Sequence, residues 1–414
     1  MDKKVIVIGG GIAGLAAAAE LLRQDCEVKL LEAKPRLGGR IHTISDSLLP
    51  IELGAEFMHG QSAALRVAIQ AAGLSSHEIS LRNDFFEDGK FRRKDIWSQM
   101  SKIIHRINPA SPDCSMEKFL LNENIDDELR KKITGFVNGF HAAPASKISA
   151  HSLRRAEYAA EHMESMAQSR LDAGYSALID FLADDVRSHG GTISHNALVK
   201  KVKWQTGSVA VEFSQAGKTE TIQADRVLVT VPLGVLKSGA IEFVPSLNKK
   251  MEAINQLEVG NVIKIILRFR ERCWPDFDFI QAPDEQLSTW WTDSRGPVLT
   301  GWAGGPHADS LSSLTHSRLE ALALSTVEKL FSKSAGKLKN NFISSYYHDW
   351  AKDPQACGAY SYIPVNGLDL PKLLAAPVHK TLFFAGEATV FDAQTGLVSE
   401  AYETGLRAAR ELIG

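Results

Sequence analysis

The most restrictive feature of this sequence is a glycine pattern close to its beginning. Residues 4–8 (KVIVI) are typical of a strand buried on both faces of a parallel sheet, and residues 12–23 (IAGLAAAAELLR) are strong helix formers. Between them lie Gly9, Gly11 and Gly14. The first glycine of such a turn permits the tight bend, the second lets a pyrophosphate approach the backbone, and the third lets helix and strand pack closely. The pattern predicts a dinucleotide site, and the alternative is a tight turn without a ligand.

The residues that follow indicate which dinucleotide is bound. A second strand is predicted over residues 27–32 (EVKLLE), ending on Glu32 where a ribose hydroxyl would be held. Next comes "EAKPRLGGRIHT", in which arginines flank two glycines. An FAD fold needs this arrangement because the chain passes close to the flavin and diphosphate, and arginine offers paired hydrogen bonds to phosphate. The alternative for the arginines is plain surface charge. We expect FAD contacts from Arg36, Gly38, Gly39 and Arg40.

Bulk properties exclude several classes of function. The net charge is −2, from 47 Lys and Arg against 49 Asp and Glu, so no nucleic-acid partner is expected. No apolar run reaches the ~18 residues that span a bilayer, and no membrane partner is expected. The four cysteines are far apart, without a C-x-x-C pair, so no metal site is predicted. Unpaired thiols, and a first strand that leaves no room for a signal peptide, favour the cytoplasm.

The rest of the chain alternates between types of structure. We predict a hairpin centred on Asp88 and Gly89, mostly helical structure over residues 114–170, strands over 192–231 and a helix over 317–334. The chain ends on a strand, a loop opening at Gly386, and a helix. Without a repeat or a flexible linker, the domains are expected to be interleaved.

The chain resembles the flavin-containing amine oxidases, the family of monoamine oxidases, polyamine oxidases and lysine-specific histone demethylases. The resemblance runs along the whole chain, in "VIVIGGGIAGLAAAAELL", "LLEAKPRLGGRIHT", "IELGAEFMHG", "ADRVLVTVPLGVLK", "LEVGNVIKIILRF", "WAKDPQACGAYSYIPVNG" and "LFFAGEAT". It implies an α/β fold in which a Rossmann-like FAD-binding domain of the GR2 type is interleaved with a substrate domain made of a mixed sheet and helices. The expected FAD-binding segments are residues 1–75, 171–239 and 373–414, and the expected substrate-binding segments are 76–170 and 240–372.

The resemblance also implies a reaction. An amine would be oxidised at a C–N bond, with hydride passing to flavin N5, hydrolysis of the imine, and reduction of O2 to hydrogen peroxide. Leu397 lies where monoamine oxidases place the second tyrosine of an aromatic cage, which favours a polyamine-oxidase-like or demethylase-like enzyme over a monoamine oxidase, and a polyamine-oxidase-like enzyme is the one we expect. Ala359 replaces the cysteine that monoamine oxidases link to flavin, so FAD is expected to be non-covalent, and Cys357 is not expected to substitute for it.

Four residues are expected to carry the chemistry. Lys264, in the apolar run "GNVIKIILRF", would by itself be expected at an edge with its ammonium in solvent, whereas the resemblance places it beside a water at flavin N5. Tyr360 matches the aromatic residue that lines the amine site. Glu56 and His59 lie where the chain of relatives passes near the flavin. Some polyamine oxidases carry polar groups there that meet the substrate, and Glu56 is a candidate ligand for a distal ammonium.

The terminal helix is expected to direct the positive end of its dipole at the flavin pyrimidine ring, with N–H donors near Leu397 and Val398. Its first turn, around Thr395 and Gly396, is expected to carry no acidic side chain. The same helix can also serve as a packing element. Glu400 stands where many relatives have glycine.

Further cofactor contacts come from the matched motifs. Glu387 is expected at the ribityl and diphosphate region, the backbone of Val199 at adenine, and Trp350 near the flavin, where an ordinary core position is the alternative. The cofactor set is completed by Ile12, Ala13, Ala33, Gly54, Ala55, Glu56, Tyr360, Gly386 and Gly396.

Two rivals to an amine oxidase stay open. An L-amino-acid oxidase would need an arginine directed at a substrate carboxylate, and no position identifies one. A flavin-bound binding protein of low turnover is the second, kept open by Leu397 and Glu400. A desaturase acting on apolar polyenes fits Lys264 and Tyr360 less well.

Overall fold

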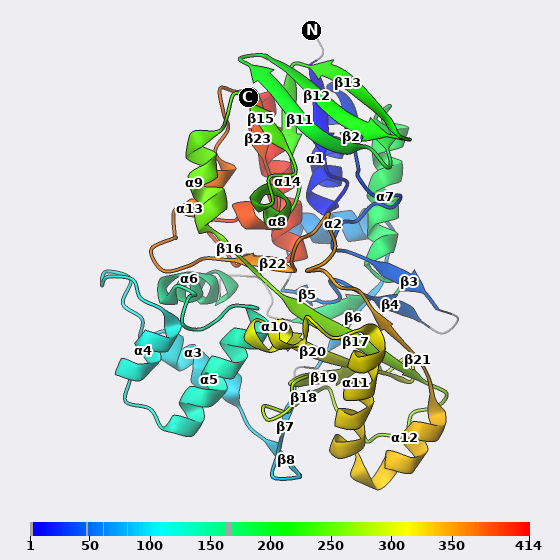
Figure 1. Ribbon diagram of the computed structural model, residues 1–414, viewed down its shortest axis with the longest axis vertical. Coiled ribbons are helices and arrows are strands. Elements are labelled where there is room, and N and C mark those ends of the chain that lie inside the picture. Colours follow the sequence, from blue (N-terminus) through cyan, green and yellow to red (C-terminus); the bar gives the residue numbers. More distant parts are fainter. Residues whose placement is uncertain (1–2, 47–48, 61, 81, 162–166) are drawn as a thin grey trace.

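The protein has a mixed α/β fold of two interleaved parts. The computed structural model describes residues 3–46, 49–60, 62–80, 82–161 and 167–414. Figure 1 shows an upper part that holds both ends of the described chain and a lower part that holds the largest sheet and a group of helices. Within the described residues, no helix combines the length and the apolar character needed to cross a bilayer.

The upper part is built on a five-stranded sheet. All of its neighbouring strands are parallel, as expected for apolar runs buried on both faces. Its strand order is β10 (Thr192–Ser194), β2 (Glu27–Leu31), β1 (Lys4–Ile8), β14 (Arg226–Val229) and β23 (Leu382–Phe384). The carboxyl ends of β1 and β2 therefore lie side by side, where a dinucleotide-binding fold places its ligand.

Helices and a second sheet cover the two faces of this sheet. One face packs against α1 (Ile12–Leu22), α7 (Tyr175–Ser188) and α14 (Val398–Ile413). The other face packs against a sheet of β13 (Lys218–Ala224), β12 (Ser208–Gln215), β11 (Leu198–Gln205) and β15 (Glu242–Val244), together with α8 (Leu233–Lys237), α9 (Asn248–Gln256) and α13 (Leu370–Ala375). Thus β15 and α9 pack with the upper part, although both follow residue 239.

The lower part contains a seven-stranded mixed sheet. Its order is β21 (Phe342–Tyr347), β17 (Val262–Phe269), β20 (Val298–Gly304), β19 (Thr289–Thr292), β18 (Phe279–Gln281), β7 (Asn83–Glu87) and β8 (Lys90–Arg93). The predicted hairpin is β7–β8, with Asp88 and Gly89 at positive φ. The helices next to the sheet are α10 (Pro306–Leu311), α11 (His316–Leu330), η1 (Ser332–Ser334) and α12 (Ala335–Asn341).

A helical group completes the lower part. It comprises α3 (Ile96–Ile104), α4 (Met116–Asn122), α5 (Asp127–Phe140) and α6 (Ala150–Glu161), which share one apolar core. The prediction of helix over residues 114–170 is wrong at its end, because β9 (Gln168–Leu171) is a strand between β5 (Met58–His59) and β6 (Ser76–Ile79). Pairing with distant strands determines its structure there, and residues 162–166 of the predicted stretch lie outside the described chain.

The remaining elements are short. They are β3 (Thr43–Ser45), β4 (Pro50–Glu52), α2 (Ala63–Ala71), β16 (Glu258–Gly260), β22 (Tyr360–Tyr362) and η2 (Glu387–Thr389). The prediction for the terminal helix needs a correction. Thr395 and Gly396 precede α14, since Gly396 has a φ of +84°, and the first turn that begins at Val398 contains the acidic Glu400.

Candidate active site

A large cavity lies between the two parts. Its volume is about 1100 Å³, above the ~300–1000 Å³ of most ligand sites. It begins at the glycine turn after β1, passes the beginning of α14, and continues between β7, α3 and α5 of the lower part. The space is therefore large enough for an extended cofactor and a second, smaller molecule.

The glycine turn is shaped as a cradle at one end of the cavity. A methyl group on Gly11 would have only the Gly38 carbonyl within reach, at 3.9 Å, so this position opens into the cavity. A methyl group on Gly14 would lie 2.0 Å from the Gly9 carbonyl oxygen, so this position needs glycine for packing. Gly11 caps α1 without a side-chain hydrogen bond, and the first turn of α1 carries no acid. These features are suited to an anion at the helix N-terminus.

Glu32 lies at the end of β2 beside this cradle. Its carboxylate accepts hydrogen bonds from the Gly10 N–H (2.7 Å) and the Lys34 N–H (2.8 Å). The side chain is buried but lines the cavity, as does Ala33. The two backbone donors fix the carboxylate in the place expected for a ribose ligand.

The two arginines after β2 lie in different environments. Arg36 donates to the carbonyls of Leu37 (3.1 Å), Gly39 (2.9 Å) and Ile41 (3.0 Å), and it does not line the cavity. It thus holds the loop that presents the neighbouring glycines. Arg40 does line the cavity, and it donates to Glu387 (2.9 Å) and to the Ala359 carbonyl (2.7 Å).

The beginning of α14 forms another wall. Leu397 is its N-terminal cap, in an extended conformation and without a side-chain cap, so the first N–H groups have no helical acceptor. Gly396 packs against the Tyr360 ring, where a methyl group would come within 3.0 Å. Glu400 in the first turn has a pKa raised to about 7 by burial and by Asp392 and Glu403, which reduces the negative charge that opposes the helix dipole at neutral pH.

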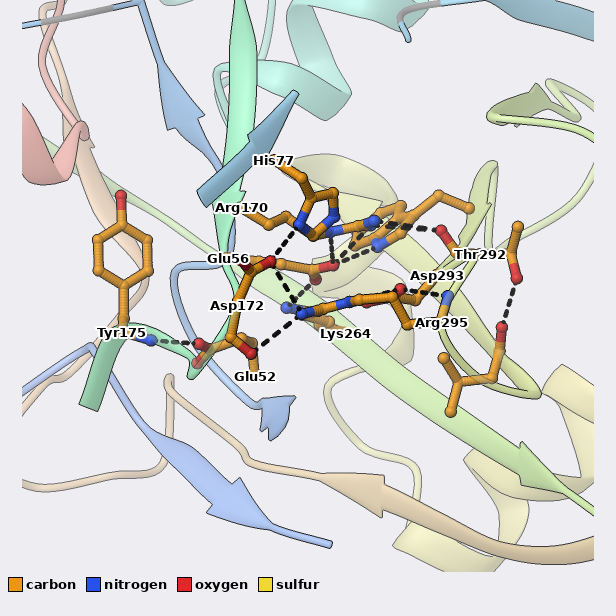
Figure 2. A network of polar contacts seen from close by, with 12 residues as sticks. Glu52, Glu56, His77, Arg170, Asp172, Tyr175, Lys264, Thr292, Asp293 and Arg295 are labelled. Carbon is orange, nitrogen blue, oxygen red and sulfur yellow. Dashed lines mark hydrogen bonds and ion pairs between the residues drawn. The ribbon is translucent and has the colours of Figure 1, made fainter. Parts of the chain in front are cut away.

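Lys264 on β17 is buried rather than exposed, so the expectation from its apolar run alone is wrong. Its side chain is 2% exposed, and its ammonium contacts Glu56 Oε2 (2.7 Å) and donates to the Gly54 carbonyl (3.1 Å). The Oε1 atom of Glu56 also accepts hydrogen bonds from the Arg170 guanidinium and from the Trp291 indole N–H (3.0 Å). Figure 2 shows how the side chains of Lys264, Glu56 and Arg170 converge.

This pairing bears on the role expected of Glu56. Burial alone would raise the pKa of Glu56, but Lys264 and Arg170 outweigh that effect and hold the pKa below its ordinary value. The ionised carboxylate already has three donors within the protein. In this structure Glu56 is the partner of Lys264, and its role as a ligand of a substrate ammonium stays a prediction.

Aromatic side chains form the wall opposite the glycine turn. The Tyr360 hydroxyl donates to the Phe140 carbonyl (2.7 Å), and burial raises the pKa of this phenol. His59 packs edge-on against Phe57 and Phe140, and burial lowers its pKa to about 4, which leaves a neutral imidazole. The wall is suited to an amine whose hydrocarbon part packs against the aromatic rings while its nitrogen meets the polar groups.

Most residues predicted to bind the cofactor line this cavity. Trp350 donates its indole N–H to the Leu53 carbonyl (3.0 Å) and lies against Gly54. Glu387 is buried and also accepts from the Ser361 hydroxyl (2.6 Å). Gly14 and Arg36 are the two exceptions. Those on the wall are Gly9, Gly11, Ile12, Ala13, Glu32, Ala33, Gly38, Gly39, Arg40, Gly54, Ala55, Glu56, Val199, Trp350, Tyr360, Gly386, Glu387, Gly396, Leu397 and Val398, together with His59 and Lys264.

Comparison with known proteins identifies the family. The profile of the family described as flavin containing amine oxidoreductase matches residues 12–131 and 113–413. The chain belongs to this family. It is therefore a flavin-dependent amine oxidoreductase. These assignments confirm the recognition, the fold class and the reaction class predicted from the sequence.

Individual relatives are similar over nearly the whole chain. Polyamine oxidase 2 of Arabidopsis thaliana is 30% identical, over 98% of this chain and 87% of its own length. Polyamine oxidase 4 of Oryza sativa subsp. japonica is 28% identical, over 98% and 88%. The human lysine-specific histone demethylase 2 is 28% identical, over 99% of this chain but 53% of its own length.

Solved structures show the same fold. Putrescine oxidase bound to putrescine superposes with a TM-score of 0.85 at 20% identity, covering 100% of this chain and 99% of that one. Cyclohexylamine oxidase from Brevibacterium oxydans gives a TM-score of 0.84 at 20% identity, with the same coverage.

Several residues of the site were missed in the sequence. Arg170 lies in a stretch whose composition favours helix, so nothing marked it as a partner of Glu56. Trp291 and Phe140 are separated from Lys264 in the sequence, and only the sheet pairing and the packing of α5 bring them to the cavity. A lysine in an apolar run needs an acceptor, and this requirement points to an acid such as Glu56. It gives no indication of Arg170.

Proposed function

We propose that the protein is an FAD-dependent oxidase of di- or polyamines that binds FAD without a covalent bond and uses O2, with hydrogen peroxide as product. One observation carries the proposal: a single cavity joins the glycine cradle, the uncapped beginning of α14 and the buried Lys264. A dinucleotide cofactor placed along it would have its phosphates at Gly11 and its ring system beside Lys264 and Tyr360.

The residues present fit FAD. The open position at Gly11 allows a diphosphate to approach the backbone, and the α1 N-terminus favours its charge. Glu32 would hold a ribose, and the first N–H groups of α14 would face the pyrimidine end of the flavin. Bound flavin supplies the acceptor for hydride from the amine and the donor for O2.

The protein side chains would orient and polarise the reactants. Lys264 has three ammonium protons. Glu56 and the Gly54 carbonyl accept two of them, so the third proton can be directed into the cavity. His59, being neutral, can accept a hydrogen bond from a substrate nitrogen, and Tyr360 supplies an aromatic face. No step requires a carboxylate as general base if the amine enters unprotonated.

Ala359 supports non-covalent binding. It lies on the wall of the cavity and offers no nucleophile, while Cys357 lies outside the lining. None of the described residues lining the cavity is a cysteine. We also propose a cytoplasmic location, from four cysteines that lie far apart in the sequence, and no nucleic-acid or membrane partner, from the near-neutral net charge.

An L-amino-acid oxidase is less favoured by the cavity. A substrate carboxylate would need an unengaged arginine near Lys264 and Tyr360. Among the described arginines on the wall, Arg40 bonds to Glu387, whereas Arg92 and Arg130 lie on the β7–β8 hairpin and α5 with acidic partners there.

A peroxide assay tests the proposal. Purified protein is given putrescine, spermidine or spermine in one series and L-amino acids in the other, with O2 consumption followed in parallel. We expect peroxide with at least one of the amines and none with amino acids. Turnover of amino acids alone would overturn the proposed substrate class.

A further inference from the structure

The buried charges around Lys264 form a group of three. Arg170 contacts Glu56 Oε1 through Nε (2.9 Å) and Nη2 (2.8 Å), while Lys264 contacts Oε2 (2.7 Å). The side chains of Arg170, Glu56 and Lys264 are 7%, 12% and 2% exposed. Two cations thus share one anion, and the group carries a net charge of +1.

Arg170 is fixed in place by several elements. It lies on β9, which pairs with β5 next to the Glu56 loop, and its guanidinium stacks on the Phe57 ring at 4.7 Å. It also donates weakly to the Thr292 carbonyl (3.4 Å). Unlike Lys264 and Glu56, it does not line the large cavity, so it can act on the reaction only through its neighbours.

Nearby acids do not cancel this charge. Asp293 forms an ion pair with Arg295 (2.8 Å), and Asp172 lies 3.5 Å from the same guanidinium and 2.6 Å from His77. Arg295 balances the buried Asp293, whereas the Asp172 side chain is 39% exposed, so solvent screens its charge. Glu52 lies near Lys264 and accepts hydrogen bonds from the Tyr175 N–H (2.6 Å) and the Thr43 hydroxyl (2.8 Å). Burial raises the pKa of Glu52 to about 7, so it does not act as a full anion at neutral pH.

A buried ion triad is a poor source of stability, because desolvation of the charges offsets much of their attraction, and apolar replacements are often as stable. A role in the reaction is the more informative explanation. An isolated Glu56–Lys264 pair would be neutral overall, and the lysine would present little net positive charge to the cavity.

We propose that Arg170 is a positioning residue that shares the charge of Glu56 and so keeps the Lys264 wall of the cavity net positive and its ammonium directed at the reactants. This inference rests on the proposed oxidase function. A positive wall stabilises negative charge that develops during the reaction with O2, and it favours the reduced, anionic form of a bound flavin.

Charge-restoring variants test the inference. Arg170→Met removes one positive charge at similar length and gives a net charge of zero. Arg170→Met combined with Glu56→Gln returns the net charge to +1, carried by Lys264 alone. Arg170→Lys keeps the charge but loses the paired hydrogen bonds. The readouts are the midpoint potential of the bound flavin and the rate at which O2 reoxidises the amine-reduced protein.

We expect Arg170→Met to lower the potential and to slow reoxidation about tenfold, as for one unit charge acting over ~10 Å at an effective dielectric constant of ~20. The double variant should recover most of both values, which a merely structural role would not produce. Wild-type potential and rate in Arg170→Met, or no recovery in the double variant, would overturn the inference.

Two further outcomes are informative. If Arg170→Met does not fold, Arg170→Lys carries the test: a wild-type potential is expected, and a lowered potential would overturn the charge argument. Failure of the proposed function is distinguishable, because the wild-type protein would then contain no flavin or would not be reduced by amines.

Discussion

Gly11 and Gly14 lie in the same turn, yet a methyl group on each meets opposite surroundings. At Gly11 the backbone has a φ of −75° and a ψ of 177°, which alanine adopts freely, and the added carbon has only the Gly38 carbonyl within reach, at 3.9 Å. At Gly14 the added carbon would lie 2.0 Å from the Gly9 carbonyl oxygen and 2.9 Å from the Thr230 hydroxyl. The two alanine variants therefore separate cofactor binding from packing.

The expected magnitudes differ accordingly. Gly14→Ala forces α1 away from β1, and overpacking of about 1–3 kcal/mol exceeds the gain of up to ~1 kcal/mol in helix propensity. Gly11→Ala should change the free energy of unfolding of the apoprotein by less than about 0.5 kcal/mol. It should weaken FAD binding about tenfold or more, because the methyl group displaces the diphosphate from N–H donors worth about 1.5–3 kcal/mol each.

The assay measures both quantities on flavin-free protein. Urea unfolding gives the stability of the wild type and of each variant, and quenching of FAD fluorescence gives the dissociation constant. Gly14→Ala serves as the control for a change in the same turn. If Gly11→Ala binds FAD as tightly as the wild type, the glycine cradle is not the phosphate site and the argument fails.

Other predictions address separate parts of the protein. Lys264→Met should slow reoxidation of reduced flavin by O2 about tenfold or more while FAD still binds, and unchanged reoxidation would remove the role of the ammonium. Acid denaturation should release the flavin into the supernatant, and flavin that stays with the pellet would contradict non-covalent binding. Burial lowers the pKa of Lys250 to about 7, so the stabilising contribution of its side chain is present above about pH 10.5 and is lost as pH falls toward 7. Lys250→Met should flatten that decline of the free energy of unfolding with pH, whereas the exposed Lys249→Met, the control, should not; an unchanged slope in Lys250→Met would contradict this prediction. His59 has a folded pKa of about 4, below its ordinary value, so its contribution to the free energy of unfolding is present above about pH 6.5 and is lost as pH falls toward 4. Urea unfolding at several pH values should show that His59→Gln flattens this decline in stability. An unchanged slope would exclude His59 as its cause.

Local patterns predicted the parts of the fold that local chemistry determines. The turn after β1 has glycine where the backbone is crowded or open to a ligand, and this requirement is visible in the spacing alone. The Asp88–Gly89 turn is predictable for the same reason, because both residues adopt positive φ. Burial of β1 on both faces follows from its unbroken apolar run.

Features that depend on distant pairing were not predictable in this way. Residues 168–171 have no strand pattern, and they form β9 because β5 and β6 lie beside them. The beginning of α14 was placed too early, because the positive φ of Gly396 depends on its packing against Tyr360. Arg36 was expected at a phosphate, but three carbonyls of its own loop take its donors.

The most direct test of the proposed function follows the visible absorbance of the bound flavin when an amine is added without O2. If the cavity places an amine against flavin beside Lys264 and Tyr360, at least one of putrescine, spermidine and spermine should bleach the flavin, and admission of O2 should restore the colour with formation of peroxide. A flavin that stays oxidised with each amine, or protein that carries no flavin, would contradict the proposal.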